Sequence, residues 1–206
     1  MTTKHRIWLK ASLALWRARY KMHPSAEAKA KIHQRLKELG LEKPKPKPSP
    51  PQPHNVTMYD AVEVTQIPKT AEAVAGYTAG NWPTYNELLK QFPKAHHVSI
   101  AIAAKYDAQC LDIEAGDATP ADAPSWVRRQ HARNVKRPIL YASLSVMPDV
   151  KQALFKDHIK RSEFRLWVAH YTYKPHIEPG YDATQWTDKA LGRNLDCSLC
   201  SPSFFS

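Results

Sequence analysis

Two carboxylates separated by one residue, Asp112 and Glu114, are the side chains in this chain best suited to chemistry. They end an apolar run at residues 110–114 that predicts a β-strand, and residues i and i+2 of a strand point to the same side. Two close negative charges raise the pKa of one carboxyl, which places a proton donor beside an ionised partner. Glycoside hydrolysis uses such a pair. The alternative is an acidic strand end that only caps the next helix.

Eight short segments predict the strands that would position this pair. They lie at residues 59–64, 73–77, 98–103, 110–114, 139–143, 165–169, 183–186 and 195–198. Several are apolar at consecutive positions, as buried parallel strands are. Helix starts lie between some of them, at Thr119-Pro120 and at Pro148, where Pro is favoured in the first turn.

Strands that alternate with helices predict an α/β fold, here a small, reduced (β/α)8 barrel of the TIM type. About 150 residues are few for such a barrel, where about 250 are typical. Some helices must therefore be missing, most plainly between the first three strands. Active sites of these barrels lie at the C-terminal ends of the strands, which is where Asp112 and Glu114 are expected.

Residues 1–42 predict a basic helical hairpin that precedes the barrel. Apolar residues at positions 9, 13, 16 and 20 form one helical stripe, and those at 28, 32, 36 and 39 form a second. Pro24 ends the first helix, Ser25 caps the second, and Gly40 stops it. Residues 43–54 contain six prolines and predict an extended linker, so the barrel domain spans 55–206.

The net positive charge is concentrated in residues 1–54, the helical hairpin and linker, which we call the basic arm. Residues 1–54 hold 13 Lys and Arg against 3 Asp and Glu, a net +10, whereas residues 55–206 hold 17 against 16, a net +1. Such an arm could bind an anionic wall polymer or a negatively charged membrane face. Nucleic acid is a further alternative, because phosphate contacts need only Lys and Arg. We do not favour it, since the arm has no base-reading motif.

Other classes are disfavoured by what the sequence lacks. The sequence contains no run of 18 apolar residues, so no membrane-spanning helix is predicted. The N-terminus does not resemble a signal peptide, and we therefore expect a cytoplasmic chain. The three cysteines, Cys110, Cys197 and Cys200, predict reduced thiols rather than a disulfide or a metal site. His96-His97 has no third ligand at a suitable spacing, so we expect no metal and no cofactor.

Six short motifs, in order along residues 58–205, resemble those of family 25 glycoside hydrolases, the lysozyme-type muramidases. Asp112-Ile113-Glu114 resembles that family's Asp-x-Glu strand, and Tyr59-Asp60 resembles its Gly-Ile-Asp opening. The other four motifs are Pro-Ile-Leu-Tyr-Ala-Ser at 138–143, Leu-Trp-Val-Ala-His-Tyr at 166–171, Ala-Thr-Gln-Trp-Thr at 183–187, and Gly-Arg-Asn-Leu-Asp at 192–196. In the fifth motif the family's Trp and Gln are swapped.

The resemblance implies a role for each matched residue. Glu114 would be the general acid and Asp112 the carboxylate that activates water or stabilises the transition state. Asp60 would add a third catalytic carboxyl. Further substrate-binding residues would be Asp196 and a platform of aromatic side chains formed by Tyr141, Trp167, Tyr171 and Trp186. Trp82 and Trp126 are expected in the core. His170 could either contact the substrate or form a structural hydrogen bond.

The resemblance also implies a biological setting. Family members of this type in actinobacteria and their phages cleave peptidoglycan glycan strands. A lysin without a signal peptide would wait in the host cytoplasm until release, or travel with the virion. The family's second- and third-strand motifs are absent here. The competing hypothesis is therefore a non-catalytic module that binds cell-wall glycan on a decayed glycosidase barrel.

Overall fold

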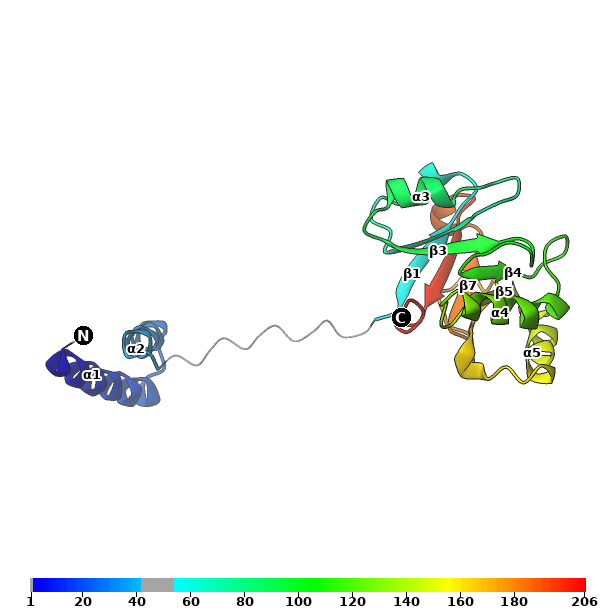
Figure 1. Ribbon diagram of the computed structural model, residues 1–206. Coiled ribbons are helices and arrows are strands. Elements are labelled where there is room, and N and C mark those ends of the chain that lie inside the picture. Colours follow the sequence, from blue (N-terminus) through cyan, green and yellow to red (C-terminus); the bar gives the residue numbers. More distant parts are fainter. Residues whose placement is uncertain (1, 42–53) are drawn as a thin grey trace. The chain divides into compact units, whose positions relative to one another are not determined.

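The computed structural model describes residues 2–41 and 54–206 (Figure 1). The chain divides into two compact units, Met1–Gln52 and Pro53–Ser206. The predicted linker at 43–54 lies outside the described residues except for His54. No helix within residues 2–41 and 54–206 has the length and apolarity needed to cross a membrane.

The first unit is the predicted helical hairpin, with α1 at Thr3–Met22 and α2 at Ala26–Glu38. The Ser25 hydroxyl oxygen accepts a hydrogen bond from the Ala28 amide at 3.2 Å, and this caps α2 as predicted. The helices pack through a small apolar cluster formed by Leu9, Leu13 and Leu39. Tyr20, expected on the same stripe, is instead 36% exposed.

The second unit is a closed barrel of eight strands with a mixed α/β composition. The strands run in chain order around the barrel: β1 Val56–Asp60, β2 Ala73–Tyr77, β3 His96–Ala101, β4 Cys110–Asp112, β5 Ile139–Ser143, β6 Arg165–Ala169, β7 Ala183–Thr187 and β8 Asp196–Cys200. Neighbours from β1 to β7 pair in parallel. The last strand, β8, is antiparallel to both β7 and β1, which an all-parallel barrel does not have.

Three helices accompany the barrel: α3 at Tyr85–Gln91, α4 at Ala123–Ala132 and α5 at Met147–Lys156. Figure 1 shows α4 and α5 together and α3 apart from them. The helices expected after Thr119 and Pro148 are confirmed, and a capping box between Thr119 and Asp122 opens the 3-10 turn that leads into the first. Our expectation that no helix lies between the second and third strands is wrong, because α3 lies there.

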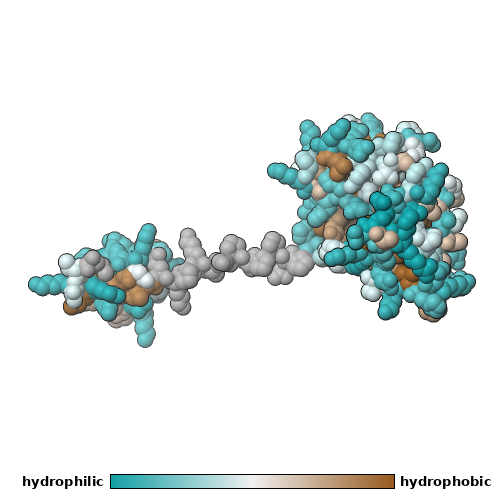
Figure 2. Space-filling model, in the orientation of Figure 1, coloured by the Kyte–Doolittle hydropathy of each residue, from teal (hydrophilic) through white to brown (hydrophobic). Residues whose placement is uncertain are grey.

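The core has two main parts, one inside the barrel and one between the barrel and its helices. Trp126 of α4 is fully buried in the outer part, and its indole N–H donates to the Tyr106 carbonyl at 2.9 Å. Trp82, also expected in the core, is instead 58% exposed in the loop after β2. Figure 2 shows that hydrophilic residues cover most of the visible face of each unit.

Gly76 on the outer face of β2 lets α3 pack against the barrel. A Cβ atom at this position would lie 2.5 Å from Leu88 Cδ1 and 2.8 Å from Thr84 Oγ1. We expect Gly76→Ala to lower the free energy of unfolding by about 1–3 kcal/mol, because α3 must move outward. Urea unfolding measures this, with Lys90→Ala on the exposed side of α3 as control. Equal midpoints for the two variants would contradict the close packing.

Candidate active site

The barrel topology brings four carboxyl groups to one edge. Strands β1 to β7 all end at this edge, and β8 begins there because it is antiparallel. Asp60, the last residue of β1, is paired in the register with Asp196, the first of β8. Asp112 is the last residue of β4, and Glu114 follows two residues later. The edge is therefore the C-terminal one, as expected for Asp112 and Glu114.

The four carboxyls line a small polar cavity of about 100 Å³ in the mouth of the barrel. The other described lining residues are Tyr77, Ile100, Tyr141, Trp167, Tyr171 and Gln185, and none of the described lining residues is Lys, Arg or His. Four acidic groups without a basic neighbour in the lining repel one another. Some of them must therefore hold protons near neutral pH.

An open groove of about 530 Å³ adjoins this cavity. Its described lining comes from the loops after β4, β5 and β6 and consists of Glu114, Ser143, Leu144, Ser145, Ala169, His170 and Tyr171. Among the four carboxyls, Glu114 alone lines both the cavity and the groove. It is thus the carboxyl that a ligand in the groove can contact.

Asp112 is the most buried of the four, with 1% of its surface exposed. The Tyr77 hydroxyl donates to Asp112 Oδ2 at 3.0 Å, whereas Oδ1 is buried without a hydrogen-bond partner among the described residues. Burial, followed by the charge of Glu114, raises the pKa of Asp112 to about 7, against the opposing effect of the Tyr77 hydrogen bond. Asp112 is therefore partly protonated at neutral pH.

Partial burial also raises the pKa of Glu114, and the charges of Asp117 and Asp196 add to this effect. The neighbouring Tyr141 hydroxyl acts in the opposite direction. Because Glu114 and Asp112 influence each other, their titration belongs to the pair. The two groups together retain a proton at a pH where isolated carboxyls are ionised.

Asp60 and Asp196 form the second pair. Burial and the neighbouring Asp196 raise the pKa of Asp60 well above its ordinary value, and burial also raises the pKa of Asp196. A hydrogen bond joins the two side chains, and it favours the ionised form of Asp196. Asp60 is thus the protonated donor of this pair, which joins the end of β1 to the start of β8.

The aromatic residues of the site have different positions. Tyr171 is 44% exposed in the groove, and its hydroxyl donates to Gln185 Oε1 at 3.3 Å. The Tyr141 hydroxyl donates to the same oxygen atom. Trp167 is only 2% exposed and packs against the Tyr141 ring with centroids 4.7 Å apart. It lines the cavity from this buried position, and its role in a sugar platform stays a prediction.

The predicted position of Trp186 in the sugar platform is wrong. It packs outside the barrel against the cluster that contains Val64 and Leu195, whereas Gln185 points into the cavity. Successive residues of a strand face opposite sides, so the swapped order of Gln and Trp in β7 exchanges their positions. Neither Gln185 nor Tyr77 was expected at the site, and the order of Gln and Trp in β7 was the available signal for Gln185.

One group of described residues has donor atoms close enough to share a metal ion. His170, His176 and Glu178 each offer one donor atom, and these atoms all lie within 4.8 Å of one another. Glu178 already pairs with both histidines, at 2.8 Å from His170 Nδ1 and 3.3 Å from His176 Nε2. These contacts hold the loop between β6 and β7 beside the groove. The sequence analysis considered only His96-His97 as metal ligands and missed this group.

The three cysteines are free and buried. Cys197 lies in a cluster outside the barrel, whereas Cys200 lies in the cluster inside it.

No protein-family model matches the chain, and neither does any curated protein or solved structure.

Proposed function

We propose that the C-terminal edge of the barrel is the active site of a glycoside hydrolase that cleaves peptidoglycan. The proposal rests mainly on the convergence of Asp60, Asp112, Glu114 and Asp196 around one cavity that opens into a groove. Asp60 and Asp112 are buried without a basic residue in the cavity lining, which costs free energy, so a chain that keeps them together with Asp196 and Glu114 is expected to use them. We further propose that the barrel is a reduced (β/α)8 barrel whose last strand is reversed.

Glu114 is the proton donor in this proposal. The glycosidic oxygen takes the Glu114 proton as its bond to the sugar C1 atom breaks, and the leaving glycan departs as an alcohol. In the reacting state the proton that the carboxyl pair shares lies on Glu114, and Asp112, which is then ionised, stabilises the positive charge that develops at C1 and the ring oxygen. A water molecule then adds to C1 and returns a proton to the carboxyl pair. No cofactor takes part in this sequence.

The groove beside Glu114 provides the substrate position. Tyr171 offers an exposed ring that suits the apolar face of a pyranose, and Ser143 and Ser145 offer hydroxyl groups for the sugar oxygens. Sequence resemblance points to the bond after N-acetylmuramic acid as the one cleaved. In this proposal the protein is a phage-type lysin that stays in the host cytoplasm until release, or that is carried by the virion.

An assay that measures binding and cleavage together tests this function. The full chain is incubated with purified actinobacterial peptidoglycan, and both bound protein and new reducing ends are counted. We expect many reducing ends per protein molecule. Binding without new ends would instead identify the competing function, a non-catalytic module that recognises wall glycan.

We propose that the basic arm anchors the enzyme to an anionic wall polymer or a negatively charged membrane face. The exposed residues of the hairpin include Arg17, Lys21, Lys29, Lys31 and Lys37. We expect neutralisation of Lys29, Lys31 and Lys37 by Gln to weaken sedimentation with wall fragments several-fold, and added salt to weaken binding of the unmodified chain. Equal sedimentation of both proteins at every salt concentration would contradict the anchoring role.

A further inference from the structure

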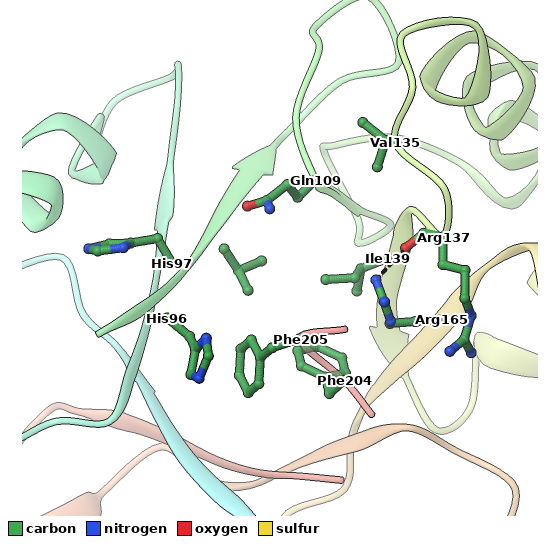
Figure 3. A pocket seen from close by; sticks show the side chains of 10 residues that line it. His96, His97, Gln109, Val135, Arg137, Ile139, Arg165, Phe204 and Phe205 are labelled. Atoms are coloured by element: carbon green, nitrogen blue, oxygen red, sulfur yellow. Dashed lines mark hydrogen bonds between the residues drawn. The ribbon is translucent and has the colours of Figure 1, made fainter. Parts of the chain in front are cut away.

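A second cavity, of about 230 Å³, lies at the opposite edge of the barrel, where the parallel strands begin (Figure 3). It is lined by residues at the starts of β3, β5 and β6 and by Phe204 and Phe205 near the end of the chain. None of the described lining residues is Asp or Glu, whereas Arg137 and Arg165 both contribute. Its charge is therefore opposite to that of the carboxyl site.

Arg165 is the central residue of this cavity. It lies two residues before Trp167 on β6, so its side chain also points into the barrel. Only 8% of its surface is exposed, and Figure 3 shows its guanidinium group directed into the cavity near Phe204. One terminal nitrogen donates to the Arg137 carbonyl at 2.8 Å. The Nε atom is buried and has no hydrogen-bond partner within the described residues.

The positive charge of Arg165 is not matched by a carboxylate of its own. The neighbouring acid, Asp182, pairs with Arg137 at 3.2 Å and with Arg161 at 2.5 Å. It also accepts a hydrogen bond from the Leu166 amide at 2.8 Å. Burial lowers the pKa of Arg165, and the charge of Arg137 adds to this effect, whereas the charge of Asp182 acts in the opposite direction without cancelling it. A buried cation without a partner costs free energy, which a bound anion would offset.

We propose that this cavity binds a small oxyanion, the carboxylate or phosphate group of a ligand, through the Arg165 guanidinium. The planar fork of donors in arginine matches both groups. The cavity has room for several water molecules, at about 30 Å³ each, and so for one such group. His96 and Phe205 stack at 4.6 Å between ring centroids and form a wall for an uncharged part of the ligand.

Thermal unfolding of the full chain tests the proposal, with inorganic phosphate and acetate as probes and chloride at equal ionic strength as reference. We expect one of the two probes to raise the midpoint saturably by several degrees, because it binds only the folded state. Arg165→Met removes this rise and leaves the unliganded protein at least as stable. Arg128→Met, at an exposed arginine paired with Asp157, retains it.

A second measurement on the unmodified chain does not depend on the folding of any variant. The Nε–H signal of Arg165 in a nitrogen-correlated proton NMR spectrum is expected to shift with the same saturation as the midpoint. The two probes separate a carboxylate site from a phosphate site. Equal rises in all three proteins reflect the general effect of the salt and overturn the proposal. Absence of a saturable response to either probe also overturns it, because the cavity then holds only water.

Discussion

Replacing Glu114 by Gln is expected to lower the rate of glycan cleavage by about 100- to 10,000-fold, the usual contribution of a general acid. Gln keeps the size of the side chain but cannot transfer a proton to the leaving oxygen. Because Glu114 lines both the cavity and the groove, no other carboxyl of the cluster can substitute for it. Release of reducing ends from purified peptidoglycan measures the loss.

The matched control is Glu87→Gln, at an exposed position on α3 away from both cavities. It should cleave at the wild-type rate. Glu114→Gln should also unfold at a temperature no lower than the wild type, because it removes one of several repelling carboxyls. If Glu114→Gln retained full activity while Asp112→Asn lost it, Glu114 would not be the acid.

Replacing Asp112 by Asn is expected to abolish cleavage and at the same time to stabilise the barrel. The amide cannot stabilise positive charge on the sugar, so the loss of rate should be comparable with that of Glu114→Gln. The amide oxygen can still accept from Tyr77, and the buried carboxyl that costs free energy is gone. A gain in stability with a loss of activity distinguishes a functional acid from a structural one.

The gain in stability of Asp112→Asn over the wild type should increase as the pH rises. The pKa of Asp112 is about 7 in the folded protein against an ordinary 3.8, so between these values the folded state binds more protons. Wild-type stability therefore falls as the pH rises through this window, whereas the Asn variant lacks this contribution. The variant should exceed the wild type by up to about 4 kcal/mol above pH 7, with the difference vanishing near pH 4.

Urea unfolding at several pH values measures this difference. Asp149→Asn, at an exposed position in the first turn of α5, is the control and should stay within about 0.5 kcal/mol of the wild type. A difference between Asp112→Asn and wild type that does not change with pH would contradict the raised pKa. A large loss of stability would show that the Asp112 carboxylate holds the barrel together.

Much of the barrel could be predicted from the sequence because several of its strands are nearly continuous apolar runs, such as β2, β5 and β6. The predicted bounds of β2, β5 and β6 match the structure, whereas the strands β1 and β3 begin earlier than expected. The early residues of these strands, such as Thr57 and His96, are polar and give no such signal. The helix α3 was missed because seven residues are too few to show a helical period.

The carboxyl cluster could be predicted only in part. Asp112 and Glu114 are close in sequence, and their spacing indicates a shared site. The family resemblance alone placed Asp60 and Asp196 at the same site, because their meeting depends on the reversed β8, which no local pattern reveals. The position of Trp186 could not be inferred from hydropathy, because both faces of β7 are buried and a shift of one residue exchanges them.

Digestion of purified peptidoglycan in water labelled with heavy oxygen tests the central claim most directly. Hydrolysis at the carboxyl cluster predicts fragments that end in N-acetylmuramic acid and carry one heavy oxygen at each new reducing end, and mass spectrometry detects both features. The fragments should be absent with Glu114→Gln. Intact peptidoglycan, or ends without the label, would contradict the claim that this site hydrolyses a glycosidic bond.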